Sequence, residues 1–538
     1  MSSSFRALIV NNIKLPVDAS VKEAFSVALK RLRRAGVSFS SPECSVYRRS
    51  VDARRRSDIC FVYSIAVCAE FSTPCDALSR IENIALLNEG EPDIVIGDEP
   101  LDASPVIVGA GPAGLFAALM LAESGYKPIV LERGGSVAER QRKVEEFNKT
   151  QILDTETNIQ FGAGGAGTFS DGKLITRIND PLSAYVLRRF VEFGAPSEIS
   201  YLAKPHIGTD VLATVVDNMI ERIESLGGRI LYHTRLNDLD FTSSRATRAV
   251  TDSGKIPVGA LILATGHSAR DTYFSLLKRG FLIEPKPFSV GMRIEHKSAD
   301  IDSALYGDMA GNSLLGHAEY ALSCDTKTRG VYTFCMCPGG EVVAAASEEG
   351  GVVVNGMSRY ARSSENSNSA VVVSVFRDDY GNTPESAIEF QRKIERAAFV
   401  AGGESYSAPI VTVGDFLQGV ASTEPKRIIP SYMGGDQVRI ASPDSYLPTF
   451  VTAGLKRGIL EFDKKIKGFA AHDAVLTGAE TRTSAPVRIM RESETRLAVG
   501  YDNVYPAGEG AGYAGGITSA AIDGIKSAIA VMKRYKPY

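Results

Sequence analysis

Three glycines, at positions 109, 111 and 114, lie between two apolar runs and could together hold a phosphate group. Gly109 permits a tight turn, Gly111 lets the backbone approach a pyrophosphate closely, and Gly114 lets a helix pack on a sheet. A helix that begins at this turn directs free N–H groups at the phosphates. Glu132 ends the next expected strand, where a carboxylate can accept a hydrogen bond from an adenosine ribose. The spacing predicts a dinucleotide site that also includes Pro112, Ala113 and Arg133.

Two further glycine-rich segments have the same spacing, but neither forms a complete second motif. Residues 162–167 follow a polar segment rather than a strand. Residues 510–515 follow an expected strand but precede no second strand that ends in an acidic residue. We therefore expect one dinucleotide-binding domain and no separate domain for NAD(P)H.

Long segments of the chain resemble a family of bacterial FAD-dependent dehydrogenases. They are NIQFGAGGAGTFSDGKLITRI, LILATGHSARDTY, VYTFCMCPGGEVVAAASEEGG, VVNGMSRYARSSENSNSA, VYPAGEGAGYAGGITSAAIDGIKSA and, near the N-terminus, YRRSVDARRRSDICFVYSIAV. The likeness extends over nearly the whole chain and, more distantly, to glutathione-reductase-type flavoproteins, which place a substrate domain over the flavin. It implies non-covalently bound FAD and hydride transfer between FAD and a small organic substrate. NAD(P)H can still act as a transient reductant of such a flavin.

The resemblance also implies which residues outside the first motif contact FAD. Gly508 and Glu509 follow an expected strand where related flavoproteins place an acidic residue against the ribityl chain. Most of them use Asp, so the Glu leaves the exact contact open. A helix that begins near Ile517 would direct its positive N-terminus at the flavin. The other residues expected at the cofactor are Gly164, Gly165, Ala264, Thr265, Gly266, Gly515 and Gly516.

The sequence does not identify the catalytic residues, and three polar side chains are candidates. Lys173 lies in the glycine-rich loop, where its charge would stabilise a reduced flavin; the alternative is a solvated lysine. His267 and Arg270 follow the Ala264–Gly266 turn. The alternative is that His267 caps the loop while Arg270 pairs with Asp271.

Cys335 and Cys337 are two further candidates, because thiolates react as nucleophiles and dithiols exchange electrons with flavins. A disulfide between residues two apart on a strand would be strained. Two reduced thiols that line the substrate domain are therefore the favoured interpretation. This spacing offers too few metal ligands and the six histidines are scattered, so no metal site is expected.

The composition is that of a soluble globular protein of several domains. The 538 residues include 44% hydrophobic and 23% charged residues, with a net charge of −3. The odd number of cysteines, seven, indicates reduced thiols. We find neither an apolar run long enough to span a membrane nor a signal peptide, and we expect a cytoplasmic protein.

The hydrophobic patterns predict an α/β fold built from four segments. Residues 1–100 form a small α+β domain that resembles a ferredoxin-like unit; residues 101–280 and 491–538 form a Rossmann-like FAD-binding domain; and residues 281–490 form an inserted α+β substrate domain. Within them we expect helices over Val21–Arg34 and Pro74–Leu87, and a polar loop over Ser363–Ser369.

Residues 1–60 are basic, with 12 Lys and Arg against 5 Asp and Glu. A solvated face is the favoured interpretation of this excess. The alternative is a flavoprotein whose N-terminal domain docks RNA through phosphate contacts, although no aromatic stacking motif accompanies the arginines. The sequence does not indicate the oligomeric state.

Overall fold

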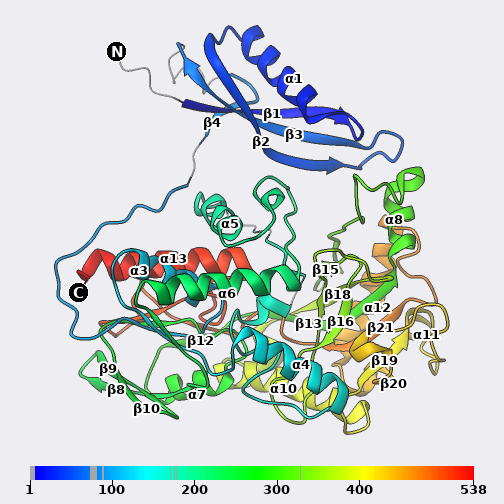
Figure 1. The fold of residues 1–538 in the computed structure, drawn as a ribbon. Helices are drawn as coiled ribbons and strands as arrows, with labels where there is room; N and C mark the ends of the chain where they lie inside the picture. Colours follow the sequence, from blue (N-terminus) through cyan, green and yellow to red (C-terminus); the bar gives the residue numbers. More distant parts are fainter. Residues whose placement is uncertain are drawn as a thin grey trace.

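The computed structural model describes residues 6–72, 81–87, 90–169, 171–174, 176, 179–326 and 329–537. In Figure 1 the N-terminal unit lies above the remainder of the chain and is joined to it by an extended segment that runs down to the first strand of the Rossmann-like sheet. The other elements form a parallel sheet with its helices and a larger, mostly antiparallel sheet beside it.

The N-terminal unit is a four-stranded antiparallel sheet covered by one described helix. Its elements are β1 (Arg6–Pro16), α1 (Val21–Arg34), β2 (Phe39–Asp52), β3 (Cys60–Phe71) and β4 (Ile84–Leu86), and the strand order is β2-β3-β1-β4. This order is compatible with the expected ferredoxin-like arrangement. Helix α1 has the predicted bounds, because Ala24, Ala28 and Leu32 recur at helical spacing and are buried.

The helix predicted over Pro74–Leu87 is wrong in its C-terminal part. Residues 84–86 form strand β4, which pairs with β1 from Leu8 to Val10. Residues 74–80 of the predicted helix lie outside the described residues. The short segment is a strand because it pairs with the edge of β1. The local sequence pattern of a segment does not reveal whether a distant strand offers it such a partner.

The Rossmann-like unit is a five-stranded parallel sheet in the order β23-β11-β5-β6-β7. Its strands are β5 (Val106–Val108), β6 (Ile129–Leu131), β7 (Arg229–Leu231), β11 (Leu261–Leu263) and β23 (Val504–Pro506). The associated helices are α3 (Pro112–Glu123), α4 (Val137–Thr150), α5 (Leu182–Glu192), α6 (Thr209–Ser225), α7 (Arg270–Lys278) and α13 (Ile517–Arg534). Strand β23 thus joins strands that lie about 240 to 400 positions before it in the chain.

The two faces of this sheet follow the alternation of side chains along its strands. Ile107 and Ile262 pack in the same apolar cluster as α3, α6 and α13. Val106, Val108 and Leu263 pack on the other face, against α7 and a three-stranded antiparallel sheet. That sheet consists of β8 (Leu236–Thr242), β9 (Arg245–Thr251) and β10 (Gly254–Pro257).

The larger unit is built on a seven-stranded sheet in the order β14-β15-β18-β13-β21-β19-β20. Its strands are β13 (Phe288–Lys297), β14 (Ser323–Asp325), β15 (Gly330–Cys337), β18 (Asn366–Val375), β19 (Ala408–Thr412), β20 (Val438–Ile440) and β21 (Val475–Glu480). Two short pairs accompany it: β12 (Ile283–Pro285) with β22 (Val487–Ile489), and β16 (Glu341–Ala344) with β17 (Val354–Met357). The helices are α8 (Ser298–Tyr306), α9 (Arg377–Tyr380), α10 (Pro384–Ala401), α11 (Val413–Gln418) and α12 (Thr449–Lys465).

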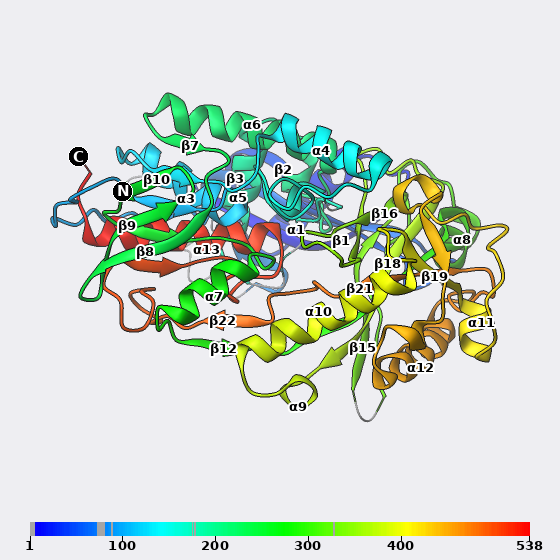
Figure 2. The same ribbon diagram turned by 90° about the horizontal axis from the view of Figure 1, so that it is seen from below.

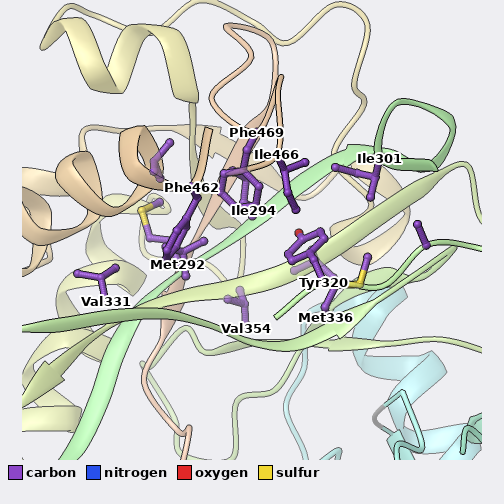
Figure 3. Close-up of a cluster of buried hydrophobic side chains, with 14 of the residues drawn as sticks. Met292, Ile294, Ile301, Tyr320, Val331, Met336, Val354, Phe462, Ile466 and Phe469 are labelled. Atoms are coloured by element: carbon purple, nitrogen blue, oxygen red, sulfur yellow. The ribbon is translucent and has the colours of Figure 1, made fainter. Parts of the chain in front are cut away.

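Helices α10 and α12 cover the seven-stranded sheet (Figure 2). A Cβ atom at Gly458 of α12 would lie 2.4 Å from Val331, so the glycine permits close approach of the helix to the sheet. Figure 3 shows the resulting core, in which Met292 and Ile294 of β13 meet Phe462 and Phe469. The pair β12–β22 joins the points where the chain enters and leaves this unit. The predicted domain boundaries at residues 280 and 490 lie near these strands and stay predictions.

The polar loop predicted over Ser363–Ser369 is wrong in its second half, because residues 366–369 form the start of β18 and are buried. The amide of Asn368 accepts a hydrogen bond of 2.7 Å from Arg293, and Asn366 donates one of 3.1 Å to Glu295. Charged partners on β13 therefore bind, in the interior, side chains that the sequence pattern places in solvent.

Candidate functional site

A cavity of about 690 Å³ lies between the carboxyl ends of the parallel strands and the seven-stranded sheet. Fifteen of the predicted cofactor residues line it: Gly109, Gly111, Pro112, Ala113, Glu132, Arg133, Gly165, Ala264, Thr265, Gly266, Gly508, Glu509, Gly515, Gly516 and Ile517. All three glycine-rich segments thus border one cavity. Gly114 and Gly164 do not line it; a Cβ atom on them would lie 1.9 Å from Gly109 O and 2.0 Å from Thr168 Oγ1, respectively.

Glu132 closes one end of the cavity, with its side chain 4% exposed. Its carboxylate accepts hydrogen bonds from the backbone N–H groups of Ala110 (2.8 Å), Gly134 (2.9 Å) and Gly162 (2.9 Å). A carboxylate can accept about four hydrogen bonds, so one acceptor position is left for a hydroxyl donor. Glu132 thus holds the first and second glycine-rich segments together at this end.

Arg140 of α4, which was not among the predicted site residues, fixes the second glycine-rich segment. Its fully buried guanidinium donates to Asn158 O (2.8 Å), Ile159 O (2.6 Å), Ala163 O (2.9 Å) and Gly165 O (2.7 Å). These four bonds hold residues 158–165 against the cavity. The signal that could have found it is a lone arginine on an otherwise buried helix face.

The N-termini of α3 and α13 both point into the cavity. The first N–H groups of a helix have no partner within the helix and carry a partial positive charge. The helices pack closely, because a Cβ atom on Gly524 of α13 would lie 2.0 Å from Ala113 O. Two helix ends therefore present donors to the middle of one cavity.

Lys173 lies on the cavity wall and belongs to a buried charged cluster. Its Nζ lies 3.8 Å from Asp171 and 3.9 Å from Glu319 and donates to the carbonyl of Met336. Arg362 binds the same two carboxylates, at 3.2 Å and 2.7 Å. Burial opposes the charge of Lys173, but Glu319 and Asp171 outweigh it and raise the pKa of the ammonium group. Lys173 is therefore cationic, and the solvated alternative is wrong.

Glu509 lines the cavity beside the N-terminus of α13. Burial raises the pKa of its carboxyl to about 7, although the charge of Lys286 acts in the opposite direction. The neighbouring Gly508 N–H donates to Asp523 of α13 at 2.7 Å. Asp523 therefore fixes the turn, and Glu509 is left to face the cavity.

His267 and Arg270 have different positions. His267 lines the cavity, and burial, with the charges of Arg482 and Arg270, lowers the pKa of its imidazole to about 3. Arg270 does not line this cavity; it binds Glu395 at 2.7 and 2.8 Å and Glu348 at 2.6 Å. Its predicted pairing with Asp271 is wrong, because the larger unit supplies buried carboxylates to Arg270.

Asp271 instead pairs with Arg133, a predicted cofactor residue (2.9 and 3.0 Å). Arg133 also binds Glu156 at 3.0 Å and stacks over the ring of Phe161. Arg235 reaches the same Glu156 at 3.0 Å. The Glu132 end of the cavity is therefore bordered by arginines that carboxylates hold in place.

Cys335 and Cys337 are separate free thiols. Cys335 lines the cavity from a bulge in β15, whereas the fully buried Cys337 is not among the lining residues. A hydrogen bond from Cys337, with the charges of Arg293 and Lys173, lowers the pKa of Cys335. Of the two thiols, only Cys335 can meet a ligand.

Residues that the sequence did not single out complete the cavity. They are Arg48 and Ser50 of β2, Lys204, Arg235, Glu319, Glu480 and Arg482. They come from all three units of the chain, so only the tertiary arrangement brings them to one place.

Comparison with known proteins identifies the family. A model of the FAD binding domain matches residues 102–153, and one described as "FAD-dependent protein, C-terminal domain-like" matches residues 287–483. An uncharacterized protein of Clostridium beijerinckii is 44% identical over 536 residues, which cover 98% of this chain and 99% of that protein. The chain belongs to a family of FAD-dependent proteins.

Solved structures resemble this FAD-dependent protein only weakly. Glycine oxidase from Bacillus cereus is 10% identical, with a TM-score of 0.35 over 80% of this chain and 98% of that one. L-amino acid deaminase from Proteus vulgaris is 13% identical, with a TM-score of 0.33 over 83% and 97%. CtdE in complex with FAD is 12% identical, with a TM-score of 0.32 over 80% and 84%. At these scores, what those proteins bind or act on does not carry over to this chain.

The cavity of this FAD-dependent protein is suited to an extended cofactor. A Cβ atom on Gly515 or Gly516 would have no atom within 4 Å, and one on Gly111 would meet only Gly165 Cα, at 3.7 Å. These glycines thus leave a cradle that side chains would otherwise fill. Its volume is within the usual range of ligand sites, about 300–1,000 Å³.

Within the described residues, no group of three or more His, Cys, Asp and Glu side chains could hold a metal ion. Among the helices of that same part of the chain, none is both long and apolar enough to cross a membrane.

Proposed function

We propose that this FAD-dependent protein is an oxidoreductase that transfers a hydride between a small organic substrate and non-covalently bound FAD. The observation that carries the proposal is the single cavity that extends from Glu132, past the N-termini of α3 and α13, to Cys335 on the seven-stranded sheet. Bound FAD supplies the hydride acceptor or donor.

Each part of the chain has a role in this proposal. Glu132 accepts a hydrogen bond from the adenosine ribose, and the N-terminus of α3, with Gly111, holds the pyrophosphate. The N-terminus of α13 and the ammonium group of Lys173 stabilise negative charge at the flavin ring. The inner wall formed by β15 and β21 encloses the substrate. We include in the proposal the glutathione-reductase-type arrangement, in which a substrate domain covers the flavin.

The chain's polar groups suggest how protons are handled. The neutral imidazole of His267 and the carboxyl of Glu509, with a pKa of about 7, both line the cavity. A group with a pKa near the working pH is suited to proton transfer. We propose Glu509 for this role, because the pKa of His267 is too low for its imidazole to take up a second proton at neutral pH.

The experiment that tests the proposal compares two glycine substitutions. Gly111→Ala places a methyl group at the expected pyrophosphate. Within the protein this methyl group would meet only Gly165 Cα, at an ordinary contact distance of 3.7 Å, so the fold can accept it. Gly351→Ala is the matched control, since its Cβ would lie 3.4 Å from Glu395 Cβ and Gly351 does not line the cavity. We expect the control to purify with the flavin content of the parent protein and Gly111→Ala to lose most of it. Equal flavin content, or a parent protein without FAD, would contradict the proposal.

A second measurement separates two classes of reductase. Anaerobic addition of NADH and then NADPH is followed by the visible absorbance of the flavin. Rapid bleaching would show that NAD(P)H is the transient reductant. Persistent absorbance would exclude NAD(P)H as the reductant and direct the search to organic substrates that bleach the flavin.

RNA docking by the N-terminal unit does not form part of this proposal. Arg54 pairs with Asp52 (2.7 and 2.8 Å), and Arg49 stacks on Phe61 and Tyr201. The two family models that match describe FAD-dependent and FAD-binding domains, and RNA docking stays a prediction of the sequence.

A further inference from the structure

We propose that the substrate carries an anionic group and that Arg48 of the N-terminal unit binds this group at the outer end of the cavity. The inference rests on the proposed function, because it places substrate in the same cavity as FAD. It assigns to the N-terminal unit a direct part in substrate recognition.

The N-terminal unit docks at the cavity through an edge strand. Strand β2 lies at the edge of its sheet, so one row of its backbone groups has no partner within that sheet. The Arg49 N–H donates to Tyr201 O at 2.7 Å, and the Ala203 N–H donates to Arg49 O at 2.8 Å. The guanidinium of Arg49 also stacks over the ring of Tyr201. Main-chain pairing thus fixes β2 beside residues 201–203.

This docking directs the neighbours of Arg49 to the cavity. Successive side chains of a strand point to opposite faces, so Arg48 and Ser50 share a face that Arg49 does not. Both Arg48 and Ser50 line the cavity, together with Ala203 and Lys204. Within the described part of the chain, the guanidinium of Arg48 has no hydrogen bond or ion pair. An arginine held over a cavity with five free N–H donors is well suited to a carboxylate or a phosphate.

The charges around Arg48 favour an anion over a cation. Lys204, which lines the cavity with Arg48, belongs to a cluster of three cations, Lys173, Lys204 and Arg362, and two carboxylates, Asp171 and Glu319. Arg362 binds both carboxylates closely, at 3.2 and 2.7 Å. The two ammonium groups lie farther from them, at 3.8 to 3.9 Å. With Arg48, this end of the cavity has an excess of positive charge that an anionic substrate would balance.

The interaction can be tested with probes that differ mainly in charge. The visible spectrum of the FAD-bound protein is titrated with benzoate, phenyl phosphate, benzamide and benzamidine, because a ligand near the ring perturbs flavin absorbance. We expect saturable shifts with one or both anions and weaker binding of neutral benzamide and cationic benzamidine. The two anions distinguish a carboxylate site from a phosphate site.

Arg48→Ala should raise the dissociation constant of the bound anion about tenfold, the effect of losing a charge-assisted hydrogen bond. It should leave benzamide binding unchanged, and Arg48→Lys should restore part of the affinity. Arg55→Ala, at an exposed arginine of the same unit that does not line the cavity, is the matched control and should bind as the parent does.

The outcomes separate this inference from the proposed function. A colourless protein that takes up no FAD would overturn both. A FAD-bound protein whose spectrum does not respond to either anion, or responds equally to benzamide, would overturn the anion inference alone. So would an Arg48→Ala protein that binds the anions as tightly as the Arg55→Ala protein does.

Discussion

The guanidinium of Arg293 on β13 and the carboxylate of Glu480 on β21 form a two-point ion pair, with distances of 2.9 and 3.2 Å, in which neither side chain is more than 3% exposed. Arg293 also donates to Asn368 Oδ1 at 2.7 Å and to Cys335 O at 3.0 Å. This one side chain therefore links four adjacent strands of the seven-stranded sheet, β15, β18, β13 and β21, at the wall of the cavity.

Replacing Arg293 by Met should destabilise the protein strongly, because Glu480 would be left as a buried charge without a partner. We expect a loss of about 3–5 kcal/mol in unfolding free energy, measured as a lower Tm. Lys464→Met is the control, since it removes an exposed pair with Glu461 (2.7 Å). Such pairs contribute about 0–1 kcal/mol. Equal Tm values for the two variants would contradict the structural role of Arg293.

Replacing Lys173 by Met should lower the reduction potential of the flavin. The substitution removes a positive charge from the cavity wall and leaves Asp171 and Glu319 less compensated, so added negative charge on the flavin becomes less favourable. We expect a change on the order of tens of millivolts. Spectroelectrochemical titration measures it, with Lys127→Met, at an exposed lysine outside the cavity, as the control. An unchanged or higher potential would show that Lys173 does not act on the flavin.

Glu509 should make stability depend on pH. Its pKa is raised from 4.5 to about 7 by burial, so the folded state holds the proton more tightly than the unfolded state does. The contribution of Glu509 to the free energy of unfolding is therefore greatest below pH 4.5, and it is lost as the pH rises to about 7. Glu509→Gln should remove this dependence. The Tm advantage of the variant over the parent should grow between pH 5 and pH 8, and an advantage independent of pH would contradict the prediction.

Removing one main-chain hydrogen bond should loosen the N-terminal unit. Ala203→Pro abolishes the N–H that donates to Arg49 O at 2.8 Å. We expect a protease specific for Glu to cut the segment after β4, at the exposed Glu91, about tenfold faster. Ala203→Gly keeps the N–H and should be cut at close to the parent rate. Equal cleavage of both variants would show that this pairing does not hold the unit.

Local sequence patterns correctly predicted the first β-α-β unit and helix α1, which have recognisable motifs within a short stretch of chain. The motif from Gly109 to Glu132 correctly indicated the first β-α-β unit. Gly114 has a local cause, because a Cβ atom on it would lie 1.9 Å from Gly109 O, whereas one on Gly109 would meet the distant Ala264 O at 2.4 Å. Helix α1 has both predicted ends: the spacing of its apolar residues indicated it, and in the structure Ser20 and Glu23 form a capping box at its start.

The rest of the site depends on contacts between distant segments. The partner of Arg270 is Glu395, from another unit, rather than the adjacent Asp271. Asn366 and Asn368 belong to a buried strand only because Glu295 and Arg293 of β13 bind them. The outer wall of the cavity joins Arg48 to Lys204, and no spacing along the chain relates these two residues.

The order of strands in the parallel sheet has a consequence for biosynthesis. Strand β23 pairs with β11, and the turn that follows it supplies Gly508, Glu509, Gly515 and Gly516 to the cavity. The first glycine motif is therefore synthesised almost four hundred residues before the segment that completes the cavity. In the proposed arrangement, a nascent chain can form the ribose and pyrophosphate contacts early, but it cannot enclose the cofactor until residue 520 has emerged. Loading of FAD is in this sense a late step, and an abundant unloaded intermediate is expected whenever translation pauses within the larger unit.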